Sequence, residues 1–119
     1  MSHKHSNTQF NDIVLFLDAF KPADISSLVN DLATVAYKWE QIALQLGFEY
    51  DAVQNIKAKP SLFHGAPLSY LQEVLGLWLK RKPPTHEYPT KPSLINALQS
   101  KSTNELMLAK TLKEKYDLV

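Results

Sequence analysis

The sequence predicts an all-α protein: an antiparallel bundle of about six helices with an additional helical segment at its N-terminus. Apolar residues recur at intervals of three and four along most of the chain, which is the periodicity of helices packed on a core. Glycine is scarce, with three in 119 residues, and seven prolines divide the chain into segments. Because proline ends a helix that approaches it, these divisions mark helix boundaries.

The first predicted element is a helix within residues 8–21, and it is apolar on nearly every side. Its shared face consists of Phe10, Val14, Leu17 and Phe20. A helix this apolar should pack on both sides or cover a groove, and a strand is the alternative for this segment. The polar residues 1–7 that precede it are predicted to be a disordered tail or a cloning remnant.

Three helices should follow this segment. The second helix is predicted to begin at Asp24, a good N-cap residue just after Pro22. The third is predicted to begin at Trp39 and to end at Gly47, and a short fourth covers residues 50–59. The buried face expected for the second helix comprises Ile25, Leu28, Val29, Leu32, Val35 and Ala36.

The longest predicted helix lies in the stretch APLSYLQEVLGLWLKRKPP, residues 66–84. Three cations, Lys80, Arg81 and Lys82, follow its apolar stripe, and cations at a helix C-terminus complement the helix dipole. The stripe consists of Leu68, Leu71, Val74 or Leu75, and Trp78.

Two short helices complete the predicted bundle. The sixth runs from Ser93, as N-cap, to Gln99, and the seventh begins after the cap candidates Ser102 and Thr103. The seventh presents Leu106, Ala109, Leu112 and Tyr116 on one face. The residues predicted to form the structural core are Leu32, Trp39, Ile42, Leu46, Val53, Ile56, Leu71, Leu75, Trp78, Leu98 and Leu112.

Composition restricts the function classes. A chain of 119 residues is expected to form one domain. It contains no cysteine, which excludes a disulfide framework and any thiolate nucleophile or metal ligand. No apolar run approaches the ~20 residues that span a bilayer, so no membrane contact is expected. The net charge of +1 gives the whole chain no strong attraction for nucleic acid.

The residues that carry chemistry are not arranged as in known enzyme motifs. The four histidines form no i, i+4 pair, and His86 and Glu87 are neighbours in a proline-rich loop. No serine lies in a Gly-x-Ser-x-Gly turn. We therefore predict a protein that is not an enzyme, with no catalytic residues, no cofactor, no metal site and no small-molecule substrate.

A helix-turn-helix nucleic-acid-binding domain is the alternative function. The stretch WEQIALQLGFEYDAVQNIKAK, residues 39–59, has the spacing of such motifs. However, its second helix begins with Glu49 and Asp51, which phosphates would repel. The cations Lys57 and Lys59 lie at the opposite end of that helix.

The order and spacing of the helices across residues 22–117 resemble the death domain. The string WxxIAxxLG, from Trp39 to Gly47, opens the family's second helix. The other matching positions are Val53 and Ile56, then Leu71, Leu75, Trp78 and Leu79, and finally the LxxAL of Leu94, Ala97 and Leu98. The predicted helix in residues 8–21 departs from the minimal six-helix pattern.

The resemblance implies a non-enzymatic protein-interaction module of the death-fold superfamily. Such modules act as adaptors or receptor domains in apoptotic and innate-immune signal transduction in the cytoplasm. They assemble with other death-fold domains, including copies of themselves, by asymmetric contacts that can build oligomers. The resemblance thus favours protein partners and neither nucleic acid nor membrane.

The charges provide two candidate interaction patches. Residues 1–55 carry three lysines and seven carboxylates, whereas residues 56–119 carry ten cations and five carboxylates. We predict an acidic patch of Glu40, Glu49 and Asp51 on one face, and a basic patch of Lys80, Arg81 and Lys82 on another. Head-to-tail assembly needs two complementary patches of this kind, which steer the encounter and set its register.

Overall fold

The computed structural model of the protein describes residues 18–59 and 66–118. Over these ranges the chain is all-α, as predicted, and forms no β-strand apart from an isolated bridge between Ala19 and Thr90. The elements in chain order are the 3-10 helix η1 (Pro22–Asp24), α2 (Ile25–Leu32), the 3-10 helix η2 (Ala33–Lys38), α3 (Trp39–Gln45), α4 (Tyr50–Lys57), α5 (Pro67–Trp78), α6 (Lys91–Gln99) and α7 (Leu106–Lys115).

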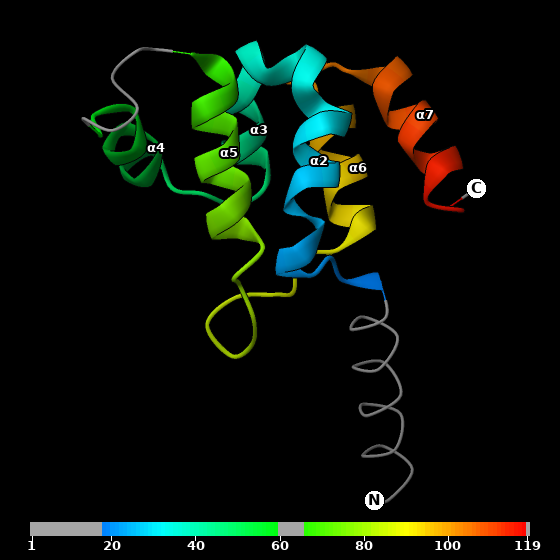
Figure 1. The fold of residues 1–119 in the computed structure, drawn as a ribbon, viewed down its shortest axis with the longest axis horizontal. Helices are drawn as coiled ribbons and strands as arrows, with labels where there is room; N and C mark the ends of the chain where they lie inside the picture. The colour runs from blue at the N-terminus through cyan, green and yellow to red at the C-terminus, as the bar shows by residue number, and fades with distance from the viewer. Residues whose placement is uncertain (1–17, 60–65, 119) are drawn as a thin grey trace, which may run out of the picture.

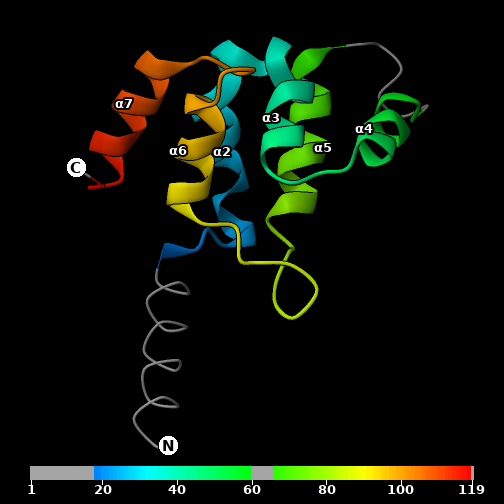
Figure 2. The same ribbon diagram turned by 180° about the vertical axis from the view of Figure 1, so that it is seen from behind.

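Helices α2, α3, α5 and α6 form the centre of the molecule, and α4 and α7 lie at its two ends (Figure 1). Helix α5 packs against α2 and α3, and α6 packs against α3 and α7. The neighbours α2 and α5 run in opposite directions, as do α6 and α7 (Figures 1 and 2). This arrangement brings the C-terminal end of α5 to the same end of the molecule as the starts of α2 and α6.

The core lies where the apolar periodicity of the sequence places it. All the residues predicted to form the structural core are buried. The Trp39 ring stacks on that of Tyr70, with centroids 4.7 Å apart, and Trp78 is only 3% exposed. Both tryptophans therefore hold α5 in the bundle, Trp39 from α3 and Trp78 from within α5 itself.

Phe20 joins this core although it precedes the predicted boundary of the bundle at residue 22. It is 7% exposed, and its ring centroid lies 5.8 Å from that of Trp78 and 5.5 Å from that of Tyr116. Its N–H donates a hydrogen bond to the Pro89 carbonyl oxygen across 2.6 Å. The rest of the helix predicted in residues 8–21, up to residue 17, and the predicted tail 1–7 lie outside the described residues.

The second predicted helix starts where it was predicted to, with Asp24 at the N-cap position of α2, but it is shorter than predicted. Its predicted span divides into α2 and η2, and Val35 leaves helical geometry with φ −112° and ψ 15°. Thr34 and Val35 are both β-branched, which lowers their helix propensity. Asp24 does not cap α2 with its side chain, because its Oδ2 accepts a hydrogen bond from the Lys21 N–H at 2.7 Å.

One helix boundary was predicted correctly from local signals and another was not. Gly47 ends α3 with a φ of +92°, a left-handed conformation that glycine adopts without strain, as predicted. Helix α6 begins earlier than predicted, since Thr90 and not Ser93 is its N-cap. The Ser93 N–H donates to Thr90 Oγ1 at 3.3 Å, and the Thr90 N–H donates to Ser93 Oγ at 3.2 Å, which makes a reciprocal capping box.

Two leucines that the periodicity placed on buried faces are exposed. Leu68 is 38% exposed and Leu106 is 57% exposed. Each lies in the first turn of its helix, α5 or α7, where fewer neighbouring elements surround the side chain. The predicted caps Ser102 and Thr103 do not start α7 either, because Glu105 occupies its N-cap position.

Candidate protein-interaction surface

The basic segment follows α5 directly, and its three cations have different surroundings. Lys80 and Lys82 are exposed and form no ion pair with another described residue. Arg81 instead turns inward: its Nη1 donates to the Leu46 carbonyl oxygen at 2.9 Å, and its guanidinium carbon lies 4.1 Å from the centroid of the Phe48 ring. Burial lowers the pKa of Arg81. Lys80 and Lys82 therefore project their charge into solvent, whereas the partly exposed guanidinium of Arg81 is held against the chain.

The three residues of the predicted acidic patch also have different surroundings. Glu49 is the N-cap of α4 and Asp51 lies in its first turn, where negative charge is favoured by the helix dipole. Both are exposed, and neither forms an ion pair with a described residue. Glu40 faces Lys57, with Oε1 3.6 Å from Nζ. Glu49 and Asp51 are thus the carboxylates of this patch that remain available to a partner.

A pocket lies beside the basic segment. Its volume is about 340 Å³, and its lining is mainly apolar. The buried residues Phe20, Leu79 and Pro89 contribute to it, and the exposed residues around it include Lys21, Lys80 and Lys82. The hydrogen bond between the Phe20 N–H and the Pro89 carbonyl brings two distant parts of the chain together to form this pocket. We call it the lysine-rimmed pocket.

A contact of Arg81 brings the basic segment close to the segment that leads into α4, which carries two of the three acidic residues. Arg81 lies within the basic segment and contacts Leu46 and Phe48, the latter directly before Glu49. Figures 1 and 2 both show the connection from α3 to α4 passing beside the C-terminal end of α5. The segment that carries the exposed lysines therefore lies close to the segment that leads into the exposed carboxylates of α4.

Tyr50 is a residue of this surface that the sequence analysis did not single out. It is the first residue of α4, stands between Glu49 and Asp51, and is 66% exposed. Its spacing of three from Val53 is that of a buried face, so periodicity gives no sign of its exposure. The signal that could have identified it is the triplet Glu-Tyr-Asp at a helix start, an aromatic residue between two carboxylates.

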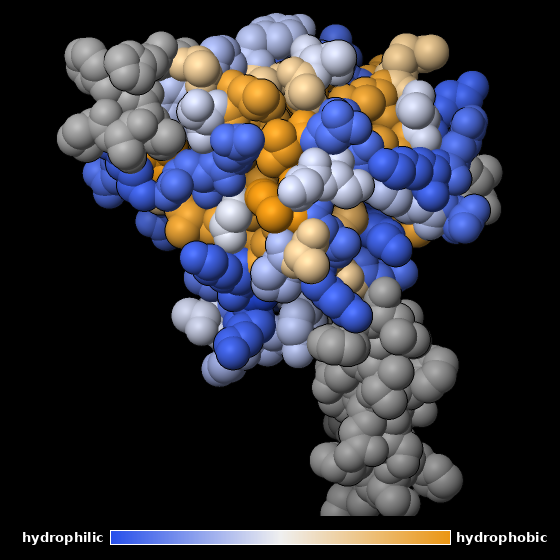
Figure 3. Space-filling view, viewed as in Figure 1, coloured by the Kyte–Doolittle hydropathy of each residue, from blue (hydrophilic) through white to orange (hydrophobic). Residues whose placement is uncertain are grey.

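A second apolar surface lies between α2 and α5. Figure 3 shows exposed apolar side chains gathered over these helices in the view of Figure 1. The groove there has a volume of about 400 Å³, and the apolar residues that line it include Ile25, Val29 and Leu68. Polar side chains of Asn30 and Gln72 also border it, and no lysine or carboxylate among the described residues does. The lysine-rimmed pocket is therefore bordered by charged side chains, whereas the described residues that line this groove are uncharged.

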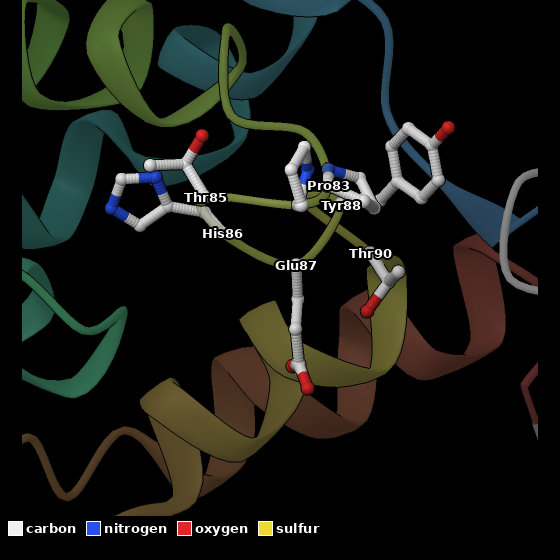
Figure 4. Close-up of a pocket in the computed structure, with 7 residues that line it drawn as sticks. Pro83, Thr85, His86, Glu87, Tyr88 and Thr90 are labelled. Carbon is white, nitrogen blue, oxygen red and sulfur yellow. The ribbon is translucent and has the colours of Figure 1, made fainter.

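The loop between α5 and α6 encloses a further cavity of about 440 Å³. His86 and Glu87, the adjacent acid–base pair noted in the sequence, both line it. In Figure 4 the imidazole of His86 and the carboxylate of Glu87 point in different directions, and the ring of Tyr88 points in a third. The polar groups of this loop thus diverge, whereas acid–base chemistry requires groups that converge on one reacting atom.

The lysines that could serve a helix-turn-helix motif are held within the chain. Lys57 faces Glu40, and Lys59 forms an ion pair with Glu73. Over residues 18–59 and 66–118, no three histidine or carboxylate side chains are grouped as a metal site would require. In the same part of the chain, no helix has the length and apolar character needed to cross a membrane.

Comparison of this chain with protein-family models, with curated proteins and with solved structures finds no match.

Proposed function

We propose that this chain is a non-enzymatic protein-interaction module that associates with further copies of itself and with other domains of its type. The observation that carries the proposal is the distribution of unpaired charge. Glu49 and Asp51 at the start of α4, and Lys80 and Lys82 after α5, are exposed, and none of them is paired within the described residues. Complementary exposed charges of this kind steer association and fix its register.

The paired charges elsewhere support this assignment. Among residues 18–59 and 66–118, four ion pairs join distant parts of the chain: Lys38–Glu105, Lys57–Glu40, Lys59–Glu73 and Lys115–Asp31. Glu49, Asp51, Lys80 and Lys82 lie outside these pairs and remain available to a partner. Exposed pairs contribute at most about 1 kcal/mol each, so several must act together for association.

The resemblance to the death domain indicates the kind of partner. The helical composition and the buried tryptophans are compatible with a six-helix death-fold bundle. On this basis the partners are other death-fold domains, and the process is signalling of the apoptotic or innate-immune type in the cytoplasm.

Charge reversal tests the proposal. The basic-reversed variant, Lys80→Glu with Lys82→Glu, and the acid-reversed variant, Glu49→Lys with Asp51→Lys, should each lose self-association in sedimentation velocity at low salt. An equimolar mixture of the two should associate, because opposite charges face one another again. Arg81 and Glu40 stay unchanged, since both are engaged within the chain.

A matched control is Lys101→Glu with Lys110→Glu, which reverses two exposed lysines outside the basic segment. This variant should associate like the wild type. If the basic-reversed and acid-reversed variants both associate as strongly as the wild type while circular dichroism shows that they are folded, the proposed function is wrong.

A further inference from the structure

Tyr50 has the chemistry of an anchor. An exposed tyrosine buries roughly 150–250 Å² when it enters a pocket, and its hydroxyl can remain near water at the rim. Its exposed fraction of 66% is nearly the same as the 67% of Tyr37, but Tyr37 is followed by Lys38 and not flanked by carboxylates. Tyr50 thus combines a large exposed ring with two unpaired negative charges.

The lysine-rimmed pocket has the complementary chemistry. Its lining is mainly apolar, with buried Phe20, Leu79 and Pro89, and three exposed lysines surround it. Its volume of about 340 Å³ is at the lower end of the roughly 300–1,000 Å³ of small-ligand pockets, which suits a single ring. An aromatic side chain between two carboxylates matches both the apolar lining and the cationic rim.

The positions of anchor and pocket determine the symmetry of the contact. Two complementary patches on opposite faces lead to open, head-to-tail chains, whereas two patches that adjoin on one face can satisfy each other twice across a two-fold axis. The contact of Arg81 with Leu46 and Phe48 joins the pocket side to the segment that leads into Glu49. The contact therefore places the segment that lines the pocket close to the segment that leads into Tyr50.

We propose that two copies of this chain form a closed, two-fold dimer in which Tyr50 of each copy enters the lysine-rimmed pocket of the other. Glu49 and Asp51 of one copy face Lys80 and Lys82 of the second, and the reverse contact is made at the same time. Arg81 lies between the patches, close to the two-fold axis. Its guanidinium is turned against Phe48, which reduces its repulsion of the same group in the other copy.

This dimer deepens the proposed function and rests on it. Two tyrosines with their flanking residues bury less than the roughly 1,200–2,000 Å² of a standard interface. The association is therefore weak and reversible.

The symmetry is tested by the size of the complex that the two charge-reversed variants form. In a two-fold dimer the basic-reversed and acid-reversed variants pair through both contacts and give a closed one-to-one complex. In a head-to-tail arrangement they alternate in chains that grow with concentration. Sedimentation velocity over a hundredfold concentration range should show a plateau at twice the single-chain mass, both for this mixture and for the wild type.

The anchor is tested by Tyr50→Ala. Truncation of one anchoring aromatic side chain weakens a contact about tenfold. Removal of the Tyr50 ring from both chains should therefore weaken the dimer about a hundredfold. A mixed dimer of one wild-type and one Tyr50→Ala copy should be weakened about tenfold. Tyr50→Phe, which retains the ring, should dimerise within about threefold of the wild type, and the matched control Tyr37→Ala should be unchanged.

The outcomes separate this inference from the proposed function. Growth beyond the dimer overturns the two-fold symmetry, and a Tyr50→Ala variant that dimerises like the wild type overturns the role of Tyr50. Either result leaves association through the charged patches in place. Absence of self-association in the wild type and in the mixture of reversed variants overturns both.

Discussion

The Arg81 guanidinium donates a hydrogen bond to the Leu46 carbonyl oxygen across 2.9 Å. Leu46 is the C-cap of α3, where backbone carbonyls lack partners within the helix. The bond satisfies one such carbonyl and joins the end of α3 to the segment that follows α5. Arg81 is therefore a stabilising residue placed between two exposed lysines of similar charge.

Replacement of Arg81 should separate these roles. Arg81→Ala should lower the free energy of unfolding by about 1–3 kcal/mol, because it removes a hydrogen bond from a charged donor and the packing on Phe48. Lys80→Ala, one residue away and exposed, should change it by less than about 0.5 kcal/mol. Urea denaturation monitored by tryptophan fluorescence measures both. Equal stability of the two variants would show that the inward contact of Arg81 contributes nothing.

The two tryptophans should be among the most sensitive core positions. Trp39→Ala and Trp78→Ala should each cost about 3–5 kcal/mol, since both rings are buried and each would leave a large cavity. Such a loss is a large fraction of the roughly 5–15 kcal/mol that stabilises an ordinary domain. Tyr37→Ala is the control, because its ring is 67% exposed. A cost below about 1 kcal/mol for either tryptophan in urea denaturation would contradict the packing of the bundle.

These tryptophans also show which features could be predicted from the sequence. Residues such as Leu32, Ile42 and Leu71 are spaced for burial on helices, and the core depends on that spacing, so periodicity alone predicts it. Gly47 was recognisable because a positive φ at a helix end favours glycine. The division of α2 from η2 was missed because the apolar spacing continues through the break.

The candidate surface was predictable only in part. The charged patches are visible as runs of like charge, but the orientation of Arg81 depends on Leu46, which is far from it in the sequence. The pocket depends on Phe20 meeting Pro89, again a long-range contact without a local pattern. Whether Tyr50 is exposed depends on which elements surround the start of α4, and helical periodicity does not contain that information.

Stability at high pH should depend on Tyr116. Its hydroxyl donates to Asp31 Oδ2 at 3.0 Å, and burial followed by the negative charge of Asp31 raises the pKa of Tyr116. Because the folded state holds this proton more tightly than the unfolded chain, whose tyrosine pKa is about 10, the contribution is complete below that pH. It is lost progressively as the pH rises above about 10 towards the folded-state pKa.

The matched variant for this prediction is Tyr116→Phe. At pH 7 it should lose about 1–2 kcal/mol, because Asp31 keeps its ion pair with Lys115 but loses one donor. Urea denaturation between pH 8 and about pH 11 should show a stability difference between wild type and variant that shrinks above about pH 10. A difference that is constant over this range would mean that Tyr116 titrates alike in the folded and unfolded chain.

Association of the folded chain through the charged patches is tested most directly by static light scattering of the wild type across concentration, at low salt and at about 1 M salt. At low salt the measured mass should rise from the 13.5 kDa of one chain and level off at twice that value. At about 1 M salt, where the screening length falls to roughly 3 Å, the rise should move to much higher concentration. A mass that stays at 13.5 kDa at every concentration in low salt would contradict the claim.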